Sequence, residues 1–245
     1  MALEVDITKK LDGFFMHMQF RAEQEIFAIL GASGCGKSMT LKCIAGIEKP
    51  DEGRIVLDGK VLFDSEKKIN LPPQKRKVGY MFQDYALFPH MNVVQNIEAG
   101  MGKRPDRSRT ESLIRQFQLE GLEKKIPGQL SGGQKQRVWI AMALAQDTKV
   151  LFLDEPTTYL DVRYQLQILK LIQKLNREYG ITIVMVLHDI NQSLYYSDEI
   201  VAMKDGRMIA HGLPEEIITK ELVQEVYGVD LTIQSVDGKP FVIPV

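Results

Sequence analysis

Residues 25–38 read EIFAILGASGCGKS, in which an apolar run leads directly into a glycine-rich segment. The segment from Gly31 to Ser38 matches the pattern G-x-x-x-x-G-K-[ST], whose backbone N–H groups converge on phosphate oxygens. We expect Lys37 to reach the β- and γ-phosphates of a nucleotide and the Ser38 hydroxyl to bind Mg²⁺. The apolar strand before the segment, and a helix predicted over residues 37–47, are the context that a phosphate-binding loop requires.

Two further apolar runs end in side chains that can do chemistry. Residues 149–153 (KVLFL) lead into Asp154 and Glu155, and residues 181–187 (ITIVMVL) lead into His188. Short, nearly continuous apolar runs are typical of strands that are buried on both faces, as in a parallel sheet covered by helices. Ligands of such sheets bind at the carboxyl ends of the strands. The sequence therefore predicts an α/β fold with all three polar clusters at one edge of the sheet.

The adjacent carboxylates after the second run suit two different roles. An aspartate at this position can hold Mg²⁺ directly or through water, which makes Asp154 a candidate metal ligand. Glu155 is suited to act as the general base for an attacking water, or to orient that water. Two solvated acids at a strand end are the alternative, and the phosphate-binding loop earlier in the chain argues against it.

Residues 130–134 read LSGGQ and precede an amphipathic stretch, KQRVWIAMALA, over residues 135–145. Ser131 suits the N-cap of a helix, and Gly132 and Gly133 leave the backbone amides of its first turn bare. The sequence therefore predicts a second helix start that can bind an anion. Taken alone, the segment is equally compatible with a loop.

The order and spacing of these motifs resemble those of ATP-binding cassette (ABC) ATPases. The phosphate loop, LSGGQ, LFLDE and an apolar strand ending in His188 follow one another, and the resemblance covers essentially the whole chain. It implies an α/β P-loop NTPase core of the RecA-like type, with a mainly parallel sheet, an antiparallel β portion and an inserted helical subdomain. It also implies ATP and Mg²⁺ as ligands, and a homodimer in which LSGGQ of one subunit closes over ATP on the phosphate loop of the other.

The resemblance assigns roles to three more positions. Gln83 is similar to the Q-loop glutamine that contacts magnesium and water and senses the membrane partner, His188 to the switch histidine at the γ-phosphate, and Asp161 to the D-loop aspartate that communicates across the dimer. The expected catalytic residues are Glu155, His188 and Gln83, and the expected magnesium ligands are Ser38, Gln83 and Asp154. The expected nucleotide-binding residues are Gly31, Ala32, Ser33, Gly34, Cys35, Gly36, Lys37, Ser38, Met39, Phe14, Ser131, Gly132, Gly133, Gln134 and Asp161.

Members of this family usually stack the adenine ring on an aromatic side chain upstream of the phosphate loop. The corresponding stretch, residues 9–20, reads KKLDGFFMHMQF and contains neither tyrosine nor tryptophan. Phe14 or Phe15 can take this role, and both are equally compatible with core positions of a strand.

The chain is predicted to form a single ABC ATPase domain. Between about residues 85 and 146 the strand signal fades and helical patterning takes over, while residues 162–179 predict a long amphipathic helix that Gly180 ends. The predicted division is a core of residues 1–84 and 147–230, a helical subdomain of residues 85–146, and a C-terminal hairpin of residues 231–245 with Asp237-Gly238 in its turn.

Composition restricts the partners of the chain. Of its 245 residues 44% are hydrophobic and 26% charged, and 31 Lys+Arg against 32 Asp+Glu give a net charge of −1, which predicts no nucleic-acid partner. No apolar run reaches the roughly 18–20 residues of a membrane helix, and the start lacks the pattern of a signal peptide. The resemblance therefore implies a cytoplasmic protein, peripheral on the inner face of the cell membrane. Its expected partners are integral permease subunits and, indirectly, a periplasmic or extracellular solute-binding protein.

The two halves of the chain resemble different importer groups. Residues 71–97 (LPPQKRKVGYMFQDYALFPHMNVVQNI) resemble molybdate- or sulfate-type ATPases, whereas residues 187–212 (LHDINQSLYYSDEIVAMKDGRMIAHG) resemble the iron-siderophore and vitamin B12 group. The expected solute is thus molybdate or tungstate, or an iron-siderophore. Two alternatives stay open: an ABC ATPase of the repair or translation type, and an orphan or chimeric ATPase without a cognate permease.

Overall fold

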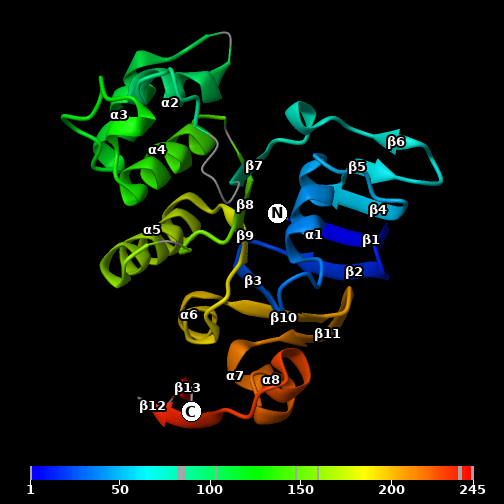
Figure 1. Cartoon of the computed structure of the whole chain (residues 1–245). Helices are drawn as coiled ribbons and strands as arrows, with labels where there is room; N and C mark the ends of the chain where they lie inside the picture. The colour runs from blue at the N-terminus through cyan, green and yellow to red at the C-terminus, as the bar shows by residue number, and fades with distance from the viewer. Residues whose placement is uncertain are drawn as a thin grey trace.

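The computed structural model describes residues 2–81, 87–102, 104–146, 148–158, 160–236 and 239–243. One large sheet contains the strands β1 (Leu3–Leu11), β2 (Phe14–Ala22), β3 (Ile26–Gly31), β4 (Glu52–Leu57), β5 (Lys60–Asp64), β6 (Ile69–Asn70), β7 (Val78–Met81), β8 (Val150–Asp154), β9 (Thr182–Val186), β10 (Glu199–Lys204) and β11 (Arg207–Gly212). They lie in the order β6-β5-β4-β1-β2-β11-β10-β3-β9-β8-β7 (Figure 1). A separate two-stranded sheet pairs β12 (Thr232–Val236) with β13 (Lys239–Ile243).

The α-helices are α1 (Lys37–Ala45), α2 (Val93–Met101), α3 (Arg107–Gln116), α4 (Gly132–Ala145), α5 (Val162–Tyr179), α6 (Ile190–Tyr196), α7 (Pro214–Ile217) and α8 (Lys220–Tyr227). Two 3₁₀ turns, η1 (Pro73–Lys75) and η2 (Pro127–Gln129), complete the described elements. None of the helices in the described part of the chain has both the length and the apolar character needed to cross a bilayer.

The sheet is mixed, and its parallel part carries the three motif-bearing strands. β10, β3, β9, β8 and β7 run parallel to one another, while β1, β2, β4, β5 and β6 pair antiparallel, as does β11 with β10. Parallel neighbours align their carboxyl ends at one edge, so the residues that follow β3, β8 and β9 lie together there. The predicted α/β fold with a parallel core and an antiparallel portion is confirmed.

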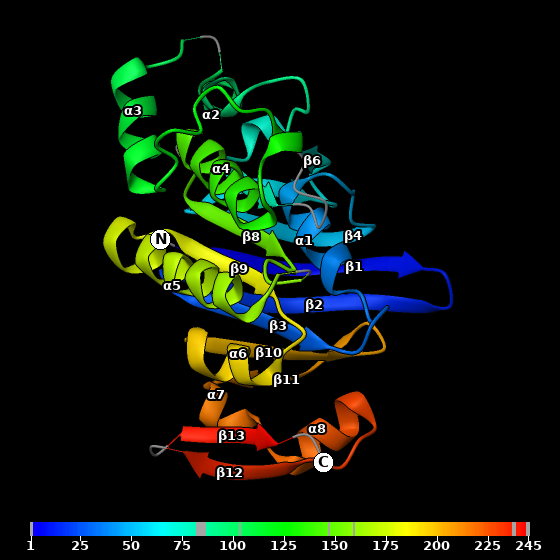
Figure 2. The same cartoon turned by 60° about the vertical axis from the view of Figure 1, so that its left-hand side comes forward.

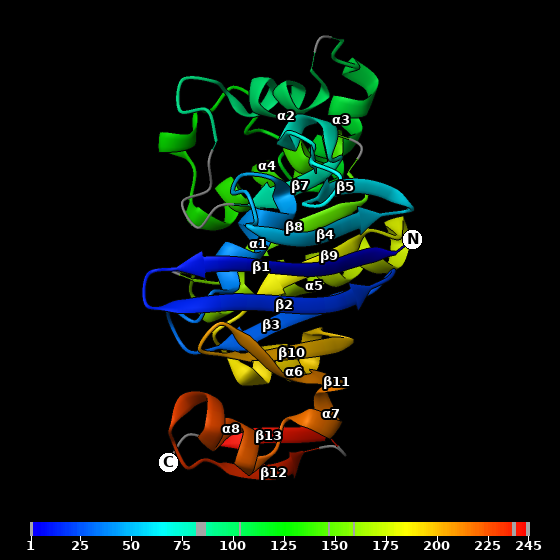
Figure 3. The ribbon, with the colours of Figure 1, turned by 90° about the vertical axis from the view of Figure 1, so that its right-hand side faces the viewer.

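Alternation along the central strands builds a core on each face of the sheet. In β3, Ile26, Ala28 and Leu30 pack on the face toward α4 and α5, while Phe27 and Ile29 pack on the opposite face with α1. Both sets are buried, which explains why the strand is apolar without interruption. Figure 2 shows α4, α5 and α6 over the first face, and Figure 3 shows the long strands β1 and β2 crossing in front of the parallel strands.

Helices α2, α3 and α4 gather beyond the β7 edge of the sheet, at the opposite end of the molecule from β12 and β13 (Figure 1). They fall within the stretch for which we predict a helical subdomain, and the limits of that subdomain remain a prediction. The C-terminal strands pair antiparallel, as expected for a hairpin, while Asp237 and Gly238, the predicted turn, lie outside the described residues. Asn191 of α6 fixes β13, because its amide donates to Val242 O and accepts from Val242 N, each at 2.8 Å.

Candidate functional site

The phosphate loop connects β3 to α1 and leaves the first turn of α1 without a side-chain cap. Gly36 is the N-cap residue, with a left-handed φ of 107°, and because it has no side chain it makes no capping hydrogen bond to the first amides. Gly31 must be glycine, because a Cβ there would lie 2.5 Å from the Met203 carbonyl oxygen. A Cβ at Gly34 would meet nothing within 4 Å, so there is free space beside the loop at that residue. Unpaired amides with the positive end of a helix dipole form an anion-binding site.

The Lys37 ammonium lies inside this loop. Its Nζ donates to Gly31 O at 2.7 Å and to Ala32 O at 2.9 Å, and the residue is only 5% exposed. Among the other predicted phosphate-binding residues, Ser33 and Gly34 are exposed, whereas Ala32, Gly36, Ser38 and Met39 are half-buried. Cys35 is buried and free, and burial raises the pKa of its thiol, so the thiol stays protonated at neutral pH.

Asp154 ends β8 opposite the start of α1 and receives two hydroxyl groups. Ser38 Oγ donates to Asp154 Oδ1 at 2.8 Å, and the Tyr80 phenol donates to Asp154 Oδ2 at 2.9 Å. Burial and the neighbouring carboxylate raise the pKa of Tyr80 well above its ordinary value, so the phenol remains a donor. The sequence alone did not indicate Tyr80 as a site residue. The parallel pairing of β7 with β8 is the signal that locates it.

Glu155 and His188 are in direct contact. His188 Nε2 lies 2.6 Å from Glu155 Oε1, and Thr158 Oγ1 donates to Glu155 Oε2 at 3.2 Å. The Glu155 side chain is 14% exposed and that of His188 45%, so the carboxylate sits deeper than the imidazole. Glu155 has a left-handed φ of 54°, which is uncommon outside glycine and concentrates at functional sites. The structure thus brings together the predicted general base and the predicted switch histidine.

The LSGGQ segment starts α4 with a reciprocal cap. Ser131 Oγ accepts from Gln134 N at 3.3 Å, and Gln134 Oε1 accepts from Ser131 N at 2.9 Å, as in a capping box. Ser131 and Gly132 are exposed, whereas Gly133 is buried against the Tyr164 ring. Within the described residues, no hydrogen bond or ion pair joins this segment to the phosphate loop of the same chain.

The loop after Glu155 is tied to α5 and α6. Asp161 caps α5 by accepting from Tyr164 N at 3.1 Å. Gln165 Nε2 donates to the Thr157 and Leu160 carbonyl oxygens at 3.2 and 3.1 Å. The Gln192 Nε2 of α6 in turn donates to Gln165 Oε1 at 2.9 Å. The loop that carries the predicted D-loop aspartate is therefore connected to the helix that follows His188, by two glutamines that the sequence did not single out.

Comparisons with known proteins agree with this geometry. The sequence profile of the ABC transporter family matches residues 16–158. This chain belongs to the ABC transporter family. It is an ATPase of that family, which confirms the resemblance on which the motif assignments depend.

The relatives of this ABC ATPase are import ATP-binding proteins. The chain is 39% identical to the petrobactin import ATP-binding protein FpuC of Bacillus anthracis, over 90% of its own length and 83% of the relative. It is 37% identical to the molybdenum import ATP-binding protein ModC of Paramagnetospirillum magneticum, over 88% of its own length and 60% of the relative, so it spans about three fifths of that protein. A solved dimer of the ATP-binding cassette MJ0796 with ADP and Pi superimposes with a TM-score of 0.73 at 31% identity, covering 87% of this chain and 99% of that one.

Gln83 lies outside the described residues. Phe14 is half-buried and packs so closely on Gly206 that a Cβ there would lie 2.5 Å from the Phe14 ring, while Phe15 is 61% exposed. The alternation of β2 thus turns Phe15 outward and Phe14 toward the core. Phe14 packs against the apolar cluster on the α1 face of the sheet, and the adenine-stacking role of Phe14 or Phe15 stays a prediction.

The donors at the site fit a nucleotide with its magnesium ion. The uncapped start of α1 and the buried ammonium of Lys37 suit phosphate oxygens, and the Ser38 hydroxyl and Asp154 carboxylate supply two oxygen ligands. The described part of the chain holds no group of three or more His, Cys, Asp or Glu side chains that could bind a metal by itself. Mg²⁺ needs none, because it keeps waters and takes further ligands from substrate phosphates.

Proposed function

We propose that this chain hydrolyses Mg-ATP as one of two head-to-tail subunits, and that hydrolysis powers solute import through an integral membrane permease. The presence of two separate helix starts that can bind anions carries this proposal. The start of α1 lies beside Asp154 and Glu155, while the start of α4 at Ser131 has no bond to that loop within the described residues. A second copy of the chain is the simplest source of a signature segment for the same nucleotide.

Within the proposed site, different residues of this chain bind the phosphates, hold the metal and accept the proton of water. Lys37 exchanges the carbonyl oxygens of its own loop for phosphate oxygens, and the amides at the start of α1 bind the same phosphates. Ser38 and Asp154 would hold the magnesium ion, which would supply positive charge to the phosphates. Glu155 accepts the proton of the attacking water. His188, whose Nε2 lies 2.6 Å from Glu155 Oε1 in this structure, orients the Glu155 carboxylate and turns toward the γ-phosphate when the nucleotide is bound. Positioned acid–base groups contribute about 10²–10⁴ in rate.

The relatives and the mixed sequence pattern support a permease partner and two classes of solute. The import proteins similar to this chain include ones named for petrobactin and for molybdenum, the two solute classes that its halves resemble, and others named for spermidine/putrescine. The proposed solute is therefore molybdate or tungstate, or an iron-siderophore. The proposed location is the cytoplasmic face of the cell membrane, where a solute-binding protein on the other side acts through the permease.

A complementation experiment tests the two-chain site. Lys37→Ala removes the cation of the phosphate loop, and Ser131→Arg places a bulky side chain at the signature helix start, so each variant alone should lack ATPase activity. In a dimer that contains one of each, one composite site carries both defects and the other carries neither. A 1:1 mixture should recover about a quarter of the wild-type rate if single sites turn over.

The control is Ser108→Arg, which adds the same side chain at the exposed start of α3. This variant should keep wild-type activity on its own. Recovery in the mixture supports the head-to-tail dimer. Wild-type activity of Ser131→Arg alone would contradict it.

A further inference from the structure

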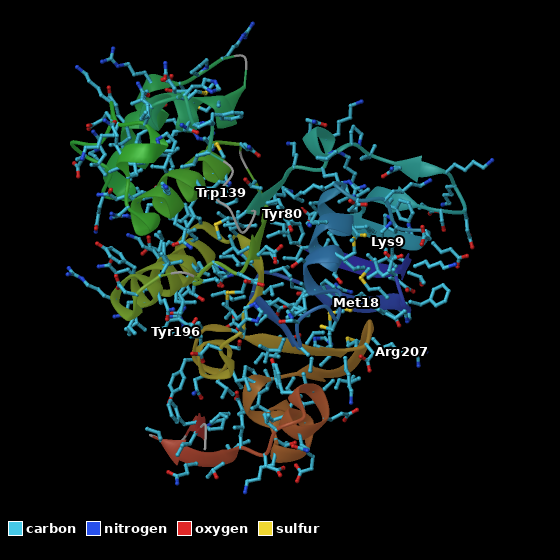
Figure 4. The ribbon with its side chains drawn as sticks, in the orientation of Figure 1. Lys9, Met18, Tyr80, Trp139, Tyr196 and Arg207 are labelled. Carbon is cyan, nitrogen blue, oxygen red and sulfur yellow. The ribbon has the colours of Figure 1, made fainter. Side chains whose placement is uncertain are left out.

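The phenol of Tyr80 reaches the predicted magnesium ligand from the neighbouring strand. Tyr80 of β7 pairs with Phe152 of β8, so the two side chains lie on the same face of the sheet. Asp154 lies two residues beyond Phe152 and therefore also faces that side. The tyrosine side chain is long enough to span this offset of two residues along the strand, and its hydroxyl oxygen lies 2.9 Å from Asp154 Oδ2. In the view of Figure 4, Tyr80 lies near the centre of the molecule, between α1 and the helices α4 and α5.

This contact fixes the orientation of the Asp154 carboxylate. Ser38 of α1 donates to Oδ1 at 2.8 Å and Tyr80 of β7 donates to Oδ2 at 2.9 Å, so each oxygen accepts a hydrogen bond from a different element. The torsion that turns a carboxylate about its last bond is otherwise broad. With both oxygens held, the carboxylate keeps one plane, and each oxygen retains a lone pair that could bind a metal ion. Asp154 is 5% exposed, so water cannot easily replace the phenol.

The ring and the hydroxyl of Tyr80 serve different purposes. The ring packs against the apolar cluster on the α1 face, which includes Phe152, and a phenylalanine would fill the same space. Only the hydroxyl reaches Asp154. Its removal therefore changes the carboxylate and leaves the packing in place.

We propose that Tyr80 is a positioning residue for magnesium, whose phenol holds the Asp154 carboxylate in the orientation that binds the metal of Mg-ATP. This inference rests on the proposed function, since it assumes that Mg-ATP binds at the phosphate loop. Hydrogen-bond partners of metal ligands typically change metal affinity by 10–100-fold when they are removed. Tyr80 is expected at the lower end, because Ser38 continues to hold the other oxygen.

The test compares metal binding with nucleotide binding in Tyr80→Phe. Mn²⁺ replaces Mg²⁺, and electron paramagnetic resonance measures its affinity for the protein saturated with a non-hydrolysable ATP analogue. The affinity of the variant for Mn²⁺ should fall about tenfold relative to wild type. Its affinity for a fluorescent ATP analogue in excess EDTA should stay within about twofold, because the phosphate loop is unchanged. Tyr196→Phe on α6, labelled in Figure 4, removes the same hydroxyl elsewhere and should match wild type in both measurements.

A thermodynamic cycle with Asp154→Asn separates positioning from general support. If Tyr80 acts through Asp154, adding Tyr80→Phe to Asp154→Asn should cause no further loss of Mn²⁺ affinity. Wild-type Mn²⁺ affinity in Tyr80→Phe would overturn the inference and leave the proposed function intact. An equal loss of affinity with and without metal would overturn it as well, because the hydroxyl would then support the loop rather than the metal. Wild-type protein that binds no nucleotide would instead refute the proposed function itself.

Discussion

Replacing Arg76 by methionine should strongly destabilise this protein, because Arg76 is buried and bonded to the last turn of the phosphate-loop helix. The residue is 1% exposed. Its Nη1 donates to Cys43 O at 3.0 Å and Ile44 O at 2.7 Å, Nε donates to Leu71 O at 2.8 Å, and Nη2 donates to Asn70 Oδ1 at 2.8 Å. Burial lowers the pKa of Arg76 to about 10, so the guanidinium remains charged at neutral pH and complements the negative end of the α1 dipole.

The expected loss of stability in Arg76→Met is the difference between the lost hydrogen bonds and the hydration cost that the buried cation no longer incurs. Hydrogen bonds from a charged donor contribute about 1.5–3 kcal/mol each, or about 6–12 kcal/mol for the set. A buried cation loses several kcal/mol of hydration, a cost that methionine does not carry. The difference leaves a loss of roughly 3–5 kcal/mol in the free energy of unfolding, much of it from carbonyl groups left without a donor. For a chain of this size, each kcal/mol lowers the melting temperature by about 2–4 °C.

Urea unfolding followed by circular dichroism, without nucleotide, measures this loss. The matched control is Arg107→Met, because the Arg107 side chain is 91% exposed and lies 3.1 Å from Glu111, whose side chain is itself 52% exposed. The control should change the free energy of unfolding by less than about 1 kcal/mol. An Arg76→Met protein within about 1 kcal/mol of wild type would refute the reasoning, since it would mean that the hydration cost cancels the hydrogen bonds.

The other predictions concern the site and its connections. Glu155→Gln keeps the shape of the side chain but cannot accept a proton, so ATPase activity should fall by about 10²–10⁴ while ATP binding persists and ATP holds a dimer during gel filtration. Near-normal turnover would remove Glu155 from its role. Gln165→Ala and Gln192→Ala should couple by about 0.5–1.5 kcal/mol in the free energy of unfolding, because each removes one half of the same hydrogen bond. Additive effects would mean that the two amides act independently.

The buried strands and the amphipathic helix were predictable because their patterns are local. The run over residues 149–153 becomes β8, and that over residues 181–187 becomes β9, each within a few residues. Such runs are unambiguous when both faces of a strand are buried, because no polar position interrupts them. The predicted helix over residues 162–179 coincides with α5, since Asp161 caps its start and Gly180, with φ 63°, ends it.

Other features depended on partners that are distant in sequence. The helix predicted over residues 37–47 ends at Ala45, because Gly46 turns into a left-handed conformation with φ 80°. Arg76 stands between two lysines in a basic run that suggests a solvated surface, yet it alone is buried. Tyr80 has no sequence pattern that links it to Asp154. Only the order of the strands brings β7 beside β8, and a polar contact across strands leaves no periodic signal.

Some predicted site residues are buried and bonded within their own chain, whereas several of those expected to meet a second copy are exposed. Lys37 and Asp154 are each 5% exposed and are bonded within their own chain. Ser131, Gly132 and Asp161 are exposed. Ser131 Oγ accepts a hydrogen bond from its own helix, but a hydroxyl also has one hydrogen to donate. Because Ser131 lies on an exposed helix start, the proposed two-chain site would let it cap α4 and at the same time donate this hydrogen to a phosphate on another subunit. An arginine in its place would end both functions, which is why the complementation experiment is built on this position.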